Sequence, residues 1–203
     1  MYSWLERFSF SVFAILLCSG FSAAADLESA KGAYEQKDYV TALKEFAVLA
    51  EQGSDVAQLT VGKMYMIGEG VTVDRDQAIR WFKAAAVQGN ADAQFFLGSM
   101  YLLPQKDIGE GLKWLRLAAE QGLQDAQYLL AKAYLEDLKD HPRDPVQAGV
   151  WMRLAAKDNK QFYQNELGVV EGQLTPDQVA KAKALATEWK PKRASNADEK
   201  LTP

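Results

Sequence analysis

Cysteine and histidine are almost absent from this 203-residue chain, which contains one of each, Cys18 and His141. A structural zinc site draws its ligands mainly from Cys and His, and a Cys-His nucleophile needs both residues in one place. Cys18 lies in an apolar run near the N-terminus, and His141 lies in a polar stretch far along the chain. We therefore expect no metal, no other cofactor, no disulfide and no Cys-His catalytic pair.

The motifs of other catalytic classes are missing as well. The sequence has no Gly-x-Ser-x-Gly motif and no phosphate-binding loop. Carboxylates alone can hydrolyse glycosides, but the recurring aspartates described below precede helices and are interpreted as caps. Glu69, Glu136 and Asp137 lie at expected helix ends or turns, and His141 is interpreted as a solvated loop residue, with a pH-sensitive contact as the alternative. These features predict a protein that is not an enzyme.

An excess of positive charge is also lacking, since the formal net charge is -4. Nucleic-acid binding requires clustered Lys and Arg to neutralise phosphates. We therefore expect no nucleic-acid partner.

Only one long apolar run is present, from Phe8 to Phe21, and its 14 residues are short for a bilayer core of about 30 Å. Together with Arg7 before it and the small residues Ala23 to Ala25 after it, the run predicts a secretory signal over residues 1–25. Cleavage near Ala25 would remove Cys18 and release a periplasmic or secreted protein without stable membrane insertion. Retention of the segment as an uncleaved anchor is the alternative.

The rest of the chain is internally repeated. Ala57-Gln58-Leu59 recurs as Ala93-Gln94-Phe95 and as Ala126-Gln127-Tyr128, at shifts of 36 and 33 residues. A fixed period of this length is typical of stacked helix pairs. The structural repeat positions are Gly62, Tyr65 and Trp81 in one unit, Gly98, Tyr101 and Trp114 in the next, and Ala131, Tyr134 and Trp151 in the third.

Helix boundaries repeat with the same period. Aspartates stand four residues before a small residue, and each of the last three has Gln or Glu three residues later, which predicts capping boxes. The pairs are Asp74 with Gln77, Asp107 with Glu110, and Asp144 with Gln147, while Asp38 is a shorter version. Gly53, Gly89, Gly122 and Asp158-Asn159 are expected to end the second helix of successive pairs.

These signals predict one repeat domain over residues 26–190, in units of about 27–53, 54–89, 90–122 and 123–159. A final pair over 160–190 is expected to cap the open end, because terminal units of repeat arrays are atypical. Residues 191–203 are expected to form a disordered tail. The expected fold class is an all-α solenoid of about five antiparallel helix pairs.

The repeated unit resembles the Sel1-like repeat, a relative of the tetratricopeptide repeat. Its pattern is Ala-Gln-aromatic-x-Leu-Gly-x-x-Tyr, followed by Gly-x-Gly-Val, Asp, Ala, Trp and Ala-Ala-x-x-Gly. The best unit runs from Asp55 to Gly89, and the resemblance covers residues 27 to 190. The Gly-x-Gly-Val turn is missing from the third and fourth units. The resemblance implies a right-handed superhelix that acts as an adaptor or scaffold, often in bacterial envelopes.

By analogy with tetratricopeptide grooves, the first helix of each pair is expected to line a concave binding face. Gly62, Gly98 and Ala131 are interpreted as the positions where helices pack closely. One row of candidate residues stands three residues before each of these positions, and another stands four residues after it. The candidate binding residues are Leu59, Lys63, Met66, Phe95, Ser99, Leu102, Tyr128, Lys132 and Leu135. An apolar stripe edged by cations suits a peptide with apolar anchors and an acidic group. The alternative is that these side chains only pack neighbouring repeats.

The sequence therefore predicts a periplasmic adaptor or scaffold that binds a protein or peptide. Two other interpretations stay open: a glycan-binding or peptidoglycan-remodelling envelope protein, which would need exposed aromatic and carboxylate clusters, and a structural subunit of an envelope or secretion complex. The identity of the partner, the pathway and the oligomeric state do not follow from the sequence.

Overall fold

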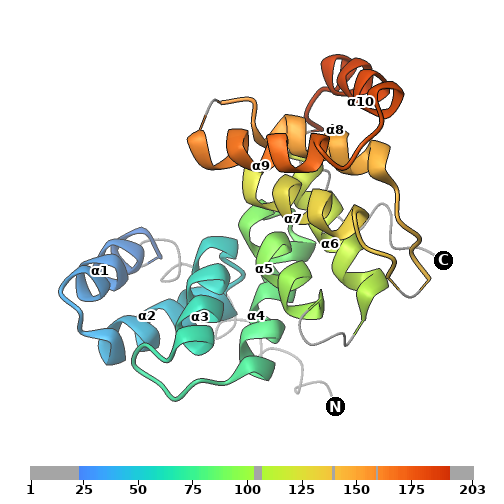
Figure 1. Cartoon of the computed structure of the whole chain (residues 1–203). Helices are drawn as coiled ribbons and strands as arrows, with labels where there is room; N and C mark the ends of the chain where they lie inside the picture. The colour runs from blue at the N-terminus through green and yellow to red at the C-terminus, as the bar shows by residue number, and fades with distance from the viewer. Residues whose placement is uncertain (1–22, 103–106, 139, 159, 193–203) are drawn as a thin grey trace, which may run out of the picture. The chain divides into compact units, whose positions relative to one another are not determined.

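The computed structural model describes residues 23–102, 107–138, 140–158 and 160–192, which form helices and no strand (Figure 1). The all-α class is therefore confirmed for the described residues. The helices are α1 (Ala23–Glu35), α2 (Tyr39–Glu51), α3 (Asp55–Ile67), α4 (Arg75–Val87), α5 (Ala91–Leu102), α6 (Ile108–Glu120), α7 (Gln124–Tyr134), α8 (Pro145–Ala155), α9 (Gln161–Glu171) and α10 (Pro176–Glu188).

The predicted signal lies largely outside the described residues, and so do Asn159 and residues 193–203 of the predicted tail. Because α1 begins at Ala23, cleavage after Ala25 would remove its first three residues. The chain forms two compact units, residues 1–78 and 79–203, whose boundary falls within α4.

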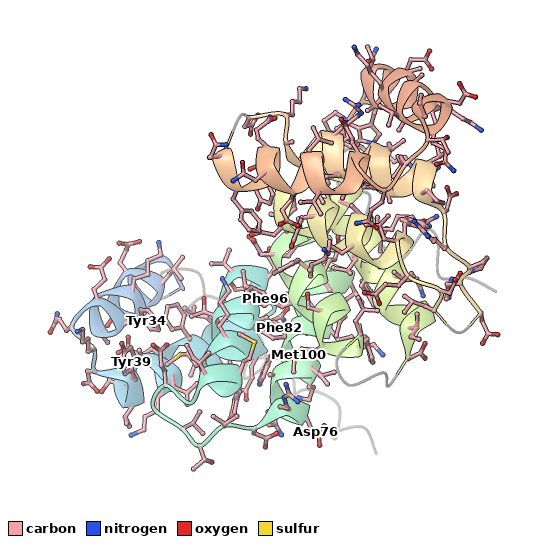
Figure 2. All side chains as sticks on the ribbon, in the orientation of Figure 1. Tyr34, Tyr39, Asp76, Phe82, Phe96 and Met100 are labelled. Carbon is pink, nitrogen blue, oxygen red and sulfur yellow. The ribbon has the colours of Figure 1, made fainter. Side chains whose placement is uncertain are left out.

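In the first unit, α1 packs on α2 and α2 packs on α3. The ring of Tyr34 on α1 meets that of Tyr39 edge-on, at a centroid distance of 5.3 Å (Figure 2). It also meets the ring of Phe46 edge-on, at 6.4 Å. The Tyr34 hydroxyl also donates to Glu69 Oε2 at 2.6 Å, which ties α1 to the turn after α3. In that turn Gly70 has φ +72°, and a Cβ there would lie 2.3 Å from the carbonyl oxygen of Tyr39, so only glycine fits.

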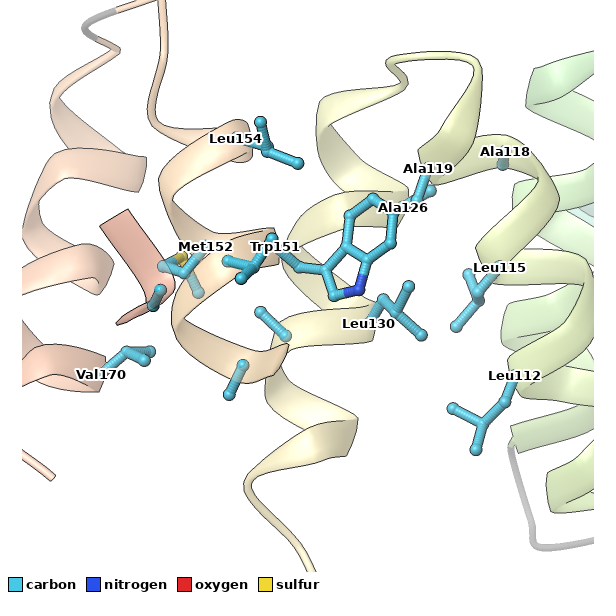
Figure 3. Packing of buried hydrophobic residues seen from close by; sticks show 14 residues of the cluster. Leu112, Leu115, Ala118, Ala119, Ala126, Leu130, Trp151, Met152, Leu154 and Val170 are labelled. Carbon is cyan, nitrogen blue, oxygen red and sulfur yellow. The ribbon is translucent and has the colours of Figure 1, made fainter. Parts of the chain in front are cut away.

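In the second unit, each helix from α5 to α8 packs on the next one along the chain. The last helix, α10, packs on α8. The core of this unit surrounds Trp151 of α8, which lies among Leu115, Leu130 and Met152 (Figure 3). The C-terminal helix extends this core, because the ring of Trp189 meets that of Trp151 edge-on at 6.4 Å. The predicted final pair therefore adds a helix over α8.

One buried hydrogen bond recurs at every helix-to-helix turn between repeats. The side-chain amide of the Gln in each of the three Ala-Gln pairs donates to the carbonyl eight residues earlier, at the end of the preceding helix, and Gln164, which follows Tyr163, makes the same bond in a part-buried setting. The bonds run from Gln58 to Ala50 (3.0 Å), Gln94 to Ala86 (3.1 Å), Gln127 to Ala119 (3.1 Å) and Gln164 to Ala156 (2.6 Å). At the first three turns the same carbonyl also accepts from the N–H of the left-handed glycine, so a single oxygen closes the turn: Gly53, Gly89 and Gly122.

A second recurring bond closes the turn within each pair. The backbone N–H of the capping aspartate donates to the carbonyl of the repeat tyrosine: Asp74 to Tyr65, Asp107 to Tyr101, and Asp144 to Tyr134. These partners lie nine, six and ten residues apart. The loop between the helices therefore varies in length while its two ends stay joined in the same way.

This closure corrects the prediction of three capping boxes. The aspartate carboxylates accept from the N–H groups of Gln77, Glu110 and Gln147 at 3.0 Å, as expected for N-caps. In a full capping box the Gln or Glu side chain would also accept from the backbone N–H of the aspartate. Here that N–H donates to a tyrosine carbonyl instead. The Glu110 carboxylate instead accepts from Lys113 and from the indole of Trp114. A complete capping box forms at Thr175 and Gln178.

Gly98 marks the closest approach of α5 and α6. A Cβ at this position would lie 2.9 Å from the carbonyl oxygen of Gly111 and 2.9 Å from Leu115. Gly168, at an equivalent place in α9, is exposed, and a Cβ added there would meet nothing within 4 Å. The two glycines therefore differ in packing although both lie inside helices.

We expect Gln127→Met to lower the free energy of unfolding by about 1 kcal/mol, because it keeps the side-chain volume but removes one hydrogen bond to a buried carbonyl. Urea denaturation followed by circular dichroism measures the change. Gln173→Met is the control, since Gln173 is exposed and should change stability by less than about 0.5 kcal/mol. Equal stability of the two variants would contradict a role for the buried bond.

We expect Gly98→Ala to cost about 1–3 kcal/mol, because the added methyl overpacks the contact with α6. Gly168→Ala should stabilise the protein by about 0.5–1 kcal/mol, because alanine favours a helix interior and meets no neighbour there. The same denaturation experiment compares the two variants. A change of the same sign in both would show that the close approach at Gly98 is unimportant.

Candidate functional site

The predicted binding residues occupy the first helix of successive pairs. In the first unit, Leu59 is buried, while Lys63 and Met66 are half-buried on α3. In the second unit all six predicted residues are half-buried: Phe95, Ser99 and Leu102 on α5, and Tyr128, Lys132 and Leu135 on or just after α7. The hydroxyl of Ser99 donates to the carbonyl of Phe95 in its own helix.

Four of these residues also serve the core. Phe95, Leu102, Tyr128 and Leu135 pack against the buried cluster around Trp151. Each therefore contributes one side to packing and leaves another part of its surface accessible.

The α7–α9 cluster consists of Tyr128 and Lys132 of α7 with Phe162 and Glu166 of α9. Glu166 Oε2 accepts from the Tyr128 hydroxyl at 3.3 Å and lies 3.8 Å from Lys132 Nζ. The ring of Phe162 meets that of Tyr128 edge-on at 5.3 Å, and Phe162 is 56% exposed. The structure therefore brings together two predicted residues, Tyr128 and Lys132, with two that the sequence analysis missed.

Phe162 and Glu166 were missed because the repeat alignment points to Asn165 as the counterpart of Tyr128. Asn165 is exposed and bonds to Gln161 within its own helix. Phe162 and Glu166 lie one turn apart on α9, and this i, i+4 spacing on an apolar and acidic pair is the only sequence signal that could have identified them.

Tyr163, the residue after Phe162 on α9, is anchored next to this cluster. Tyr163 is buried, its hydroxyl donates to Asp125 of α7, and its ring lies 6.0 Å from that of Tyr128. Burial, followed by the hydrogen bond to Asp125, raises the pKa of Tyr163 to about 12. Burial, with Glu166 as the next cause, also raises the pKa of Tyr128. Both phenols therefore stay protonated at neutral pH and act as hydrogen-bond donors.

The structural repeat positions lie mostly inside. Trp81, Trp114 and Trp151 are buried, as are Gly62, Gly98 and Ala131, while Tyr65, Tyr101 and Tyr134 are half-buried. Tyr134 has an additional contact, because its hydroxyl accepts from the guanidinium of Arg116 on α6. This tyrosine therefore lies at the surface of the core, beside a cation.

His141 is half-buried, whereas the sequence analysis interprets it as a solvated loop residue. Backbone hydrogen bonds in both directions between Leu138 and His141 make a tight hairpin, with Asp140 at φ +61°. The imidazole forms part of the wall of a cavity between α6 and the start of α8. Local hydrogen bonding across a turn, which the sequence does not reveal, explains the difference.

Within the described ranges, no group of three or more His, Cys, Asp or Glu residues is arranged to hold a metal ion. In the same residues no helix is long and apolar enough to cross a membrane.

Comparison with protein families identifies the repeats. The Sel1 repeat model matches residues 55–90, 91–123 and 124–160, which together make up more than half of the chain. The chain therefore belongs to the Sel1 repeat family, whose members are generally protein-interaction modules, and the resemblance noted in the sequence is confirmed.

Solved structures agree with this assignment. The crystal structure of a Sel1 repeat protein from Oxalobacter formigenes is 27% identical, with a TM-score of 0.65, and the match covers 82% of this chain and 70% of that chain. The crystal structure of c5321, a protective antigen present in uropathogenic Escherichia coli strains and displaying an SLR fold, is 30% identical with a TM-score of 0.42. That match covers 80% of this chain and 44% of c5321, so this chain spans less than half of its length. A comparison with curated proteins found no match. The similarity to the Oxalobacter formigenes structure confirms the all-α solenoid fold class.

We expect Tyr163→Phe to remove one tyrosine that ionises near pH 12, as followed by the ultraviolet absorbance of tyrosinate. Below the ordinary pKa of 10.0 the phenol is neutral in both folded and unfolded chains, so its contribution to stability is intact. Between pH 10.0 and about 12 the unfolded chain loses the proton and the folded chain keeps it, so stability falls as the pH rises. The variant should therefore lose less stability than the wild type across this window.

Tyr34→Phe provides a matched comparison in the first unit, because its hydrogen bond to Glu69, followed by burial, raises the pKa of Tyr34 to about 12 as well. Loss of a transition near pH 10 in the Tyr163→Phe variant, with both high-pH transitions retained, would contradict the assignment.

Proposed function

We propose that this chain is an exported, non-catalytic adaptor of the bacterial periplasm that binds a polypeptide through the first helices of its repeats. The observation that carries the proposal is the α7–α9 cluster, in which an exposed phenylalanine lies on a half-buried tyrosine next to a charged pair. Aromatic anchors surrounded by polar side chains are typical of protein-protein binding surfaces. Export is supported by the signal-like sequence of residues 1–25.

The chemistry of the cluster defines the segment that it would bind. Phe162 and Tyr128 offer apolar surface for an aromatic or aliphatic anchor. Lys132 is 42% exposed on its side chain and its ion pair with Glu166 is long, at 3.8 Å. Such a pair contributes little to stability, so an acidic group of a ligand can replace Glu166 as the partner of Lys132.

The glycan-binding alternative is less well supported. Sugars bind on exposed aromatic faces next to carboxylates, and the described Tyr and Trp residues are all buried or half-buried. Phe162 is the exposed aromatic residue of the cluster. A structural subunit of an envelope complex would differ from an adaptor in one observable way. It would co-purify stably with the other subunits, and this would not depend on the α7–α9 cluster.

We expect Phe162→Ser and Lys132→Glu each to reduce crosslinking to partner polypeptides at least about tenfold, because central anchors carry most of the binding energy of an interface. Crosslinking of intact cells, followed by mass spectrometry of the captured proteins, measures the loss. Val48→Ser and Lys157→Glu are matched controls, since both residues are exposed and lie outside the cluster.

The same samples test export, because the processed chain in the periplasmic fraction should begin at Asp26. Unchanged capture by both cluster variants would refute binding at this surface, and a full-length chain confined to the cytoplasm would refute export.

A further inference from the structure

The second unit contains a cavity of about 740 Å³ that the sequence analysis does not predict and that the proposed function does not use. We refer to it as the α6–α8 pocket. Its lining residues come mainly from α6, the hairpin loop that follows α7, and the first turn of α8. Its volume falls in the range of about 300–1,000 Å³ that is typical of small-molecule sites.

The inner wall of this pocket is apolar. Leu112, Leu117 and Val146 line it together with the indole of Trp114, and Pro142 and Pro145 fix the backbone of the opposite wall. Trp114 is buried and its Nε1 donates to Glu110 at 3.0 Å, so the ring is held in one orientation. A ligand in this pocket would therefore place an apolar body against a preformed surface.

Three cations line the same pocket: Lys113, Arg116 and Arg143. Lys113 is paired with Glu110 at 2.9 Å, and Arg116 lies over the ring of Tyr134, with its guanidinium carbon 5.9 Å from the ring centroid. Arg143 is exposed, and its backbone N–H donates to Asp137 at 3.0 Å, which holds the residue at the rim.

The acidic residues of the lining are already engaged. Glu120 forms an ion pair with Lys192 at 2.9 Å and accepts the Lys192 backbone N–H on its own carbonyl at 2.8 Å. Asp144 caps α8 by accepting from the N–H of Gln147. The pocket therefore presents cationic groups whose positive charge exceeds what its own carboxylates balance.

We propose that the α6–α8 pocket binds a small organic carboxylate with an aromatic or branched aliphatic body. The body lies against Leu112, Leu117 and Val146, and the carboxylate lies at the rim, where Arg143 and Arg116 donate to it. Charge-assisted hydrogen bonds of guanidinium to carboxylate are the strongest polar contacts that such a site can form. This site is separate from the α7–α9 cluster, so it stands independently of the proposed adaptor function.

A polypeptide is the less suitable occupant because the volume of about 740 Å³ is that of a small-molecule site and the cations of the lining are few. The chain's own residues 193–203 deserve a direct test, because Lys192 is fixed on Glu120 at the edge of the pocket. A synthetic peptide of that sequence therefore enters the experiment as a competitor.

The experiment titrates the ¹⁵N-labelled full chain with 4-phenylbutyrate and follows the NMR signals of the Trp114 indole and of His141. We expect saturable shifts at both groups, and about tenfold weaker binding of the neutral 4-phenylbutyramide, since the amide loses a charge-assisted hydrogen bond. Arg143→Gln should also weaken binding of the acid about tenfold, while Lys157→Gln, which removes an exposed charge elsewhere in the second unit, should leave it unchanged.

Equal binding of acid and amide would overturn the proposal, and so would shifts that do not saturate. Tighter binding of the 193–203 peptide than of the acid, at the same two groups, would assign the pocket to the chain itself and would equally overturn it. Because the acid and the amide are compared on the wild-type protein, the result does not depend on the folding of a variant.

Discussion

The buried amide of the Ala-Gln pair is the interaction on which the repeat architecture depends. In three successive turns it reaches back eight residues to the carbonyl that ends the preceding helix, and Gln164, which follows Tyr163, makes the same bond at the fourth turn. A carbonyl at the end of a helix has no partner within that helix, and burying it unsatisfied is costly. At the first three turns the N–H of the left-handed glycine and the glutamine amide both donate to it, and the glutamine bond ties the first turn of the next helix to the end of the preceding one. At the first three turns, buried alanines at the accepting carbonyl and just before the glutamine leave room for the helices to approach each other.

The turn within each pair follows a different rule, and this difference creates room for function. The N–H of the capping aspartate donates to the carbonyl of the repeat tyrosine whatever the length of the loop between them. The fold therefore tolerates long loops at this position. The longest of the three, between α7 and α8, folds into the hairpin that carries His141 and Arg143 to the α6–α8 pocket. Loss of the reciprocal capping bond has a consequence too, because the Glu110 carboxylate becomes available to orient Trp114.

The two candidate surfaces of the second unit have different chemistry. The α7–α9 cluster is open, with an exposed phenylalanine and an ion pair that a ligand can replace, which suits a polypeptide. The α6–α8 pocket is concave, with a rigid indole and cations at its rim, which suits a small anion. One unit of a repeat protein can carry both because the first helices of the pairs provide one surface and the second helices provide the other.

The sequence by itself determined the helices, the N-capping aspartates and the family, because repeat spacing and capping residues are local properties that recur in each unit. It did not determine the reciprocal half of the capping boxes, which the tyrosine carbonyls replace. It also identified Tyr128 and Lys132 as candidates, because their rows follow from the same spacing. It did not reveal Phe162 and Glu166, whose contacts cross between helices at positions three residues before and one residue after the aligned Asn165. Nor did it predict the pocket around Arg116 and Arg143. Only the tertiary structure decided these features, because a cavity and an ion pair depend on how non-repeated loops and side chains of different helices come together in space.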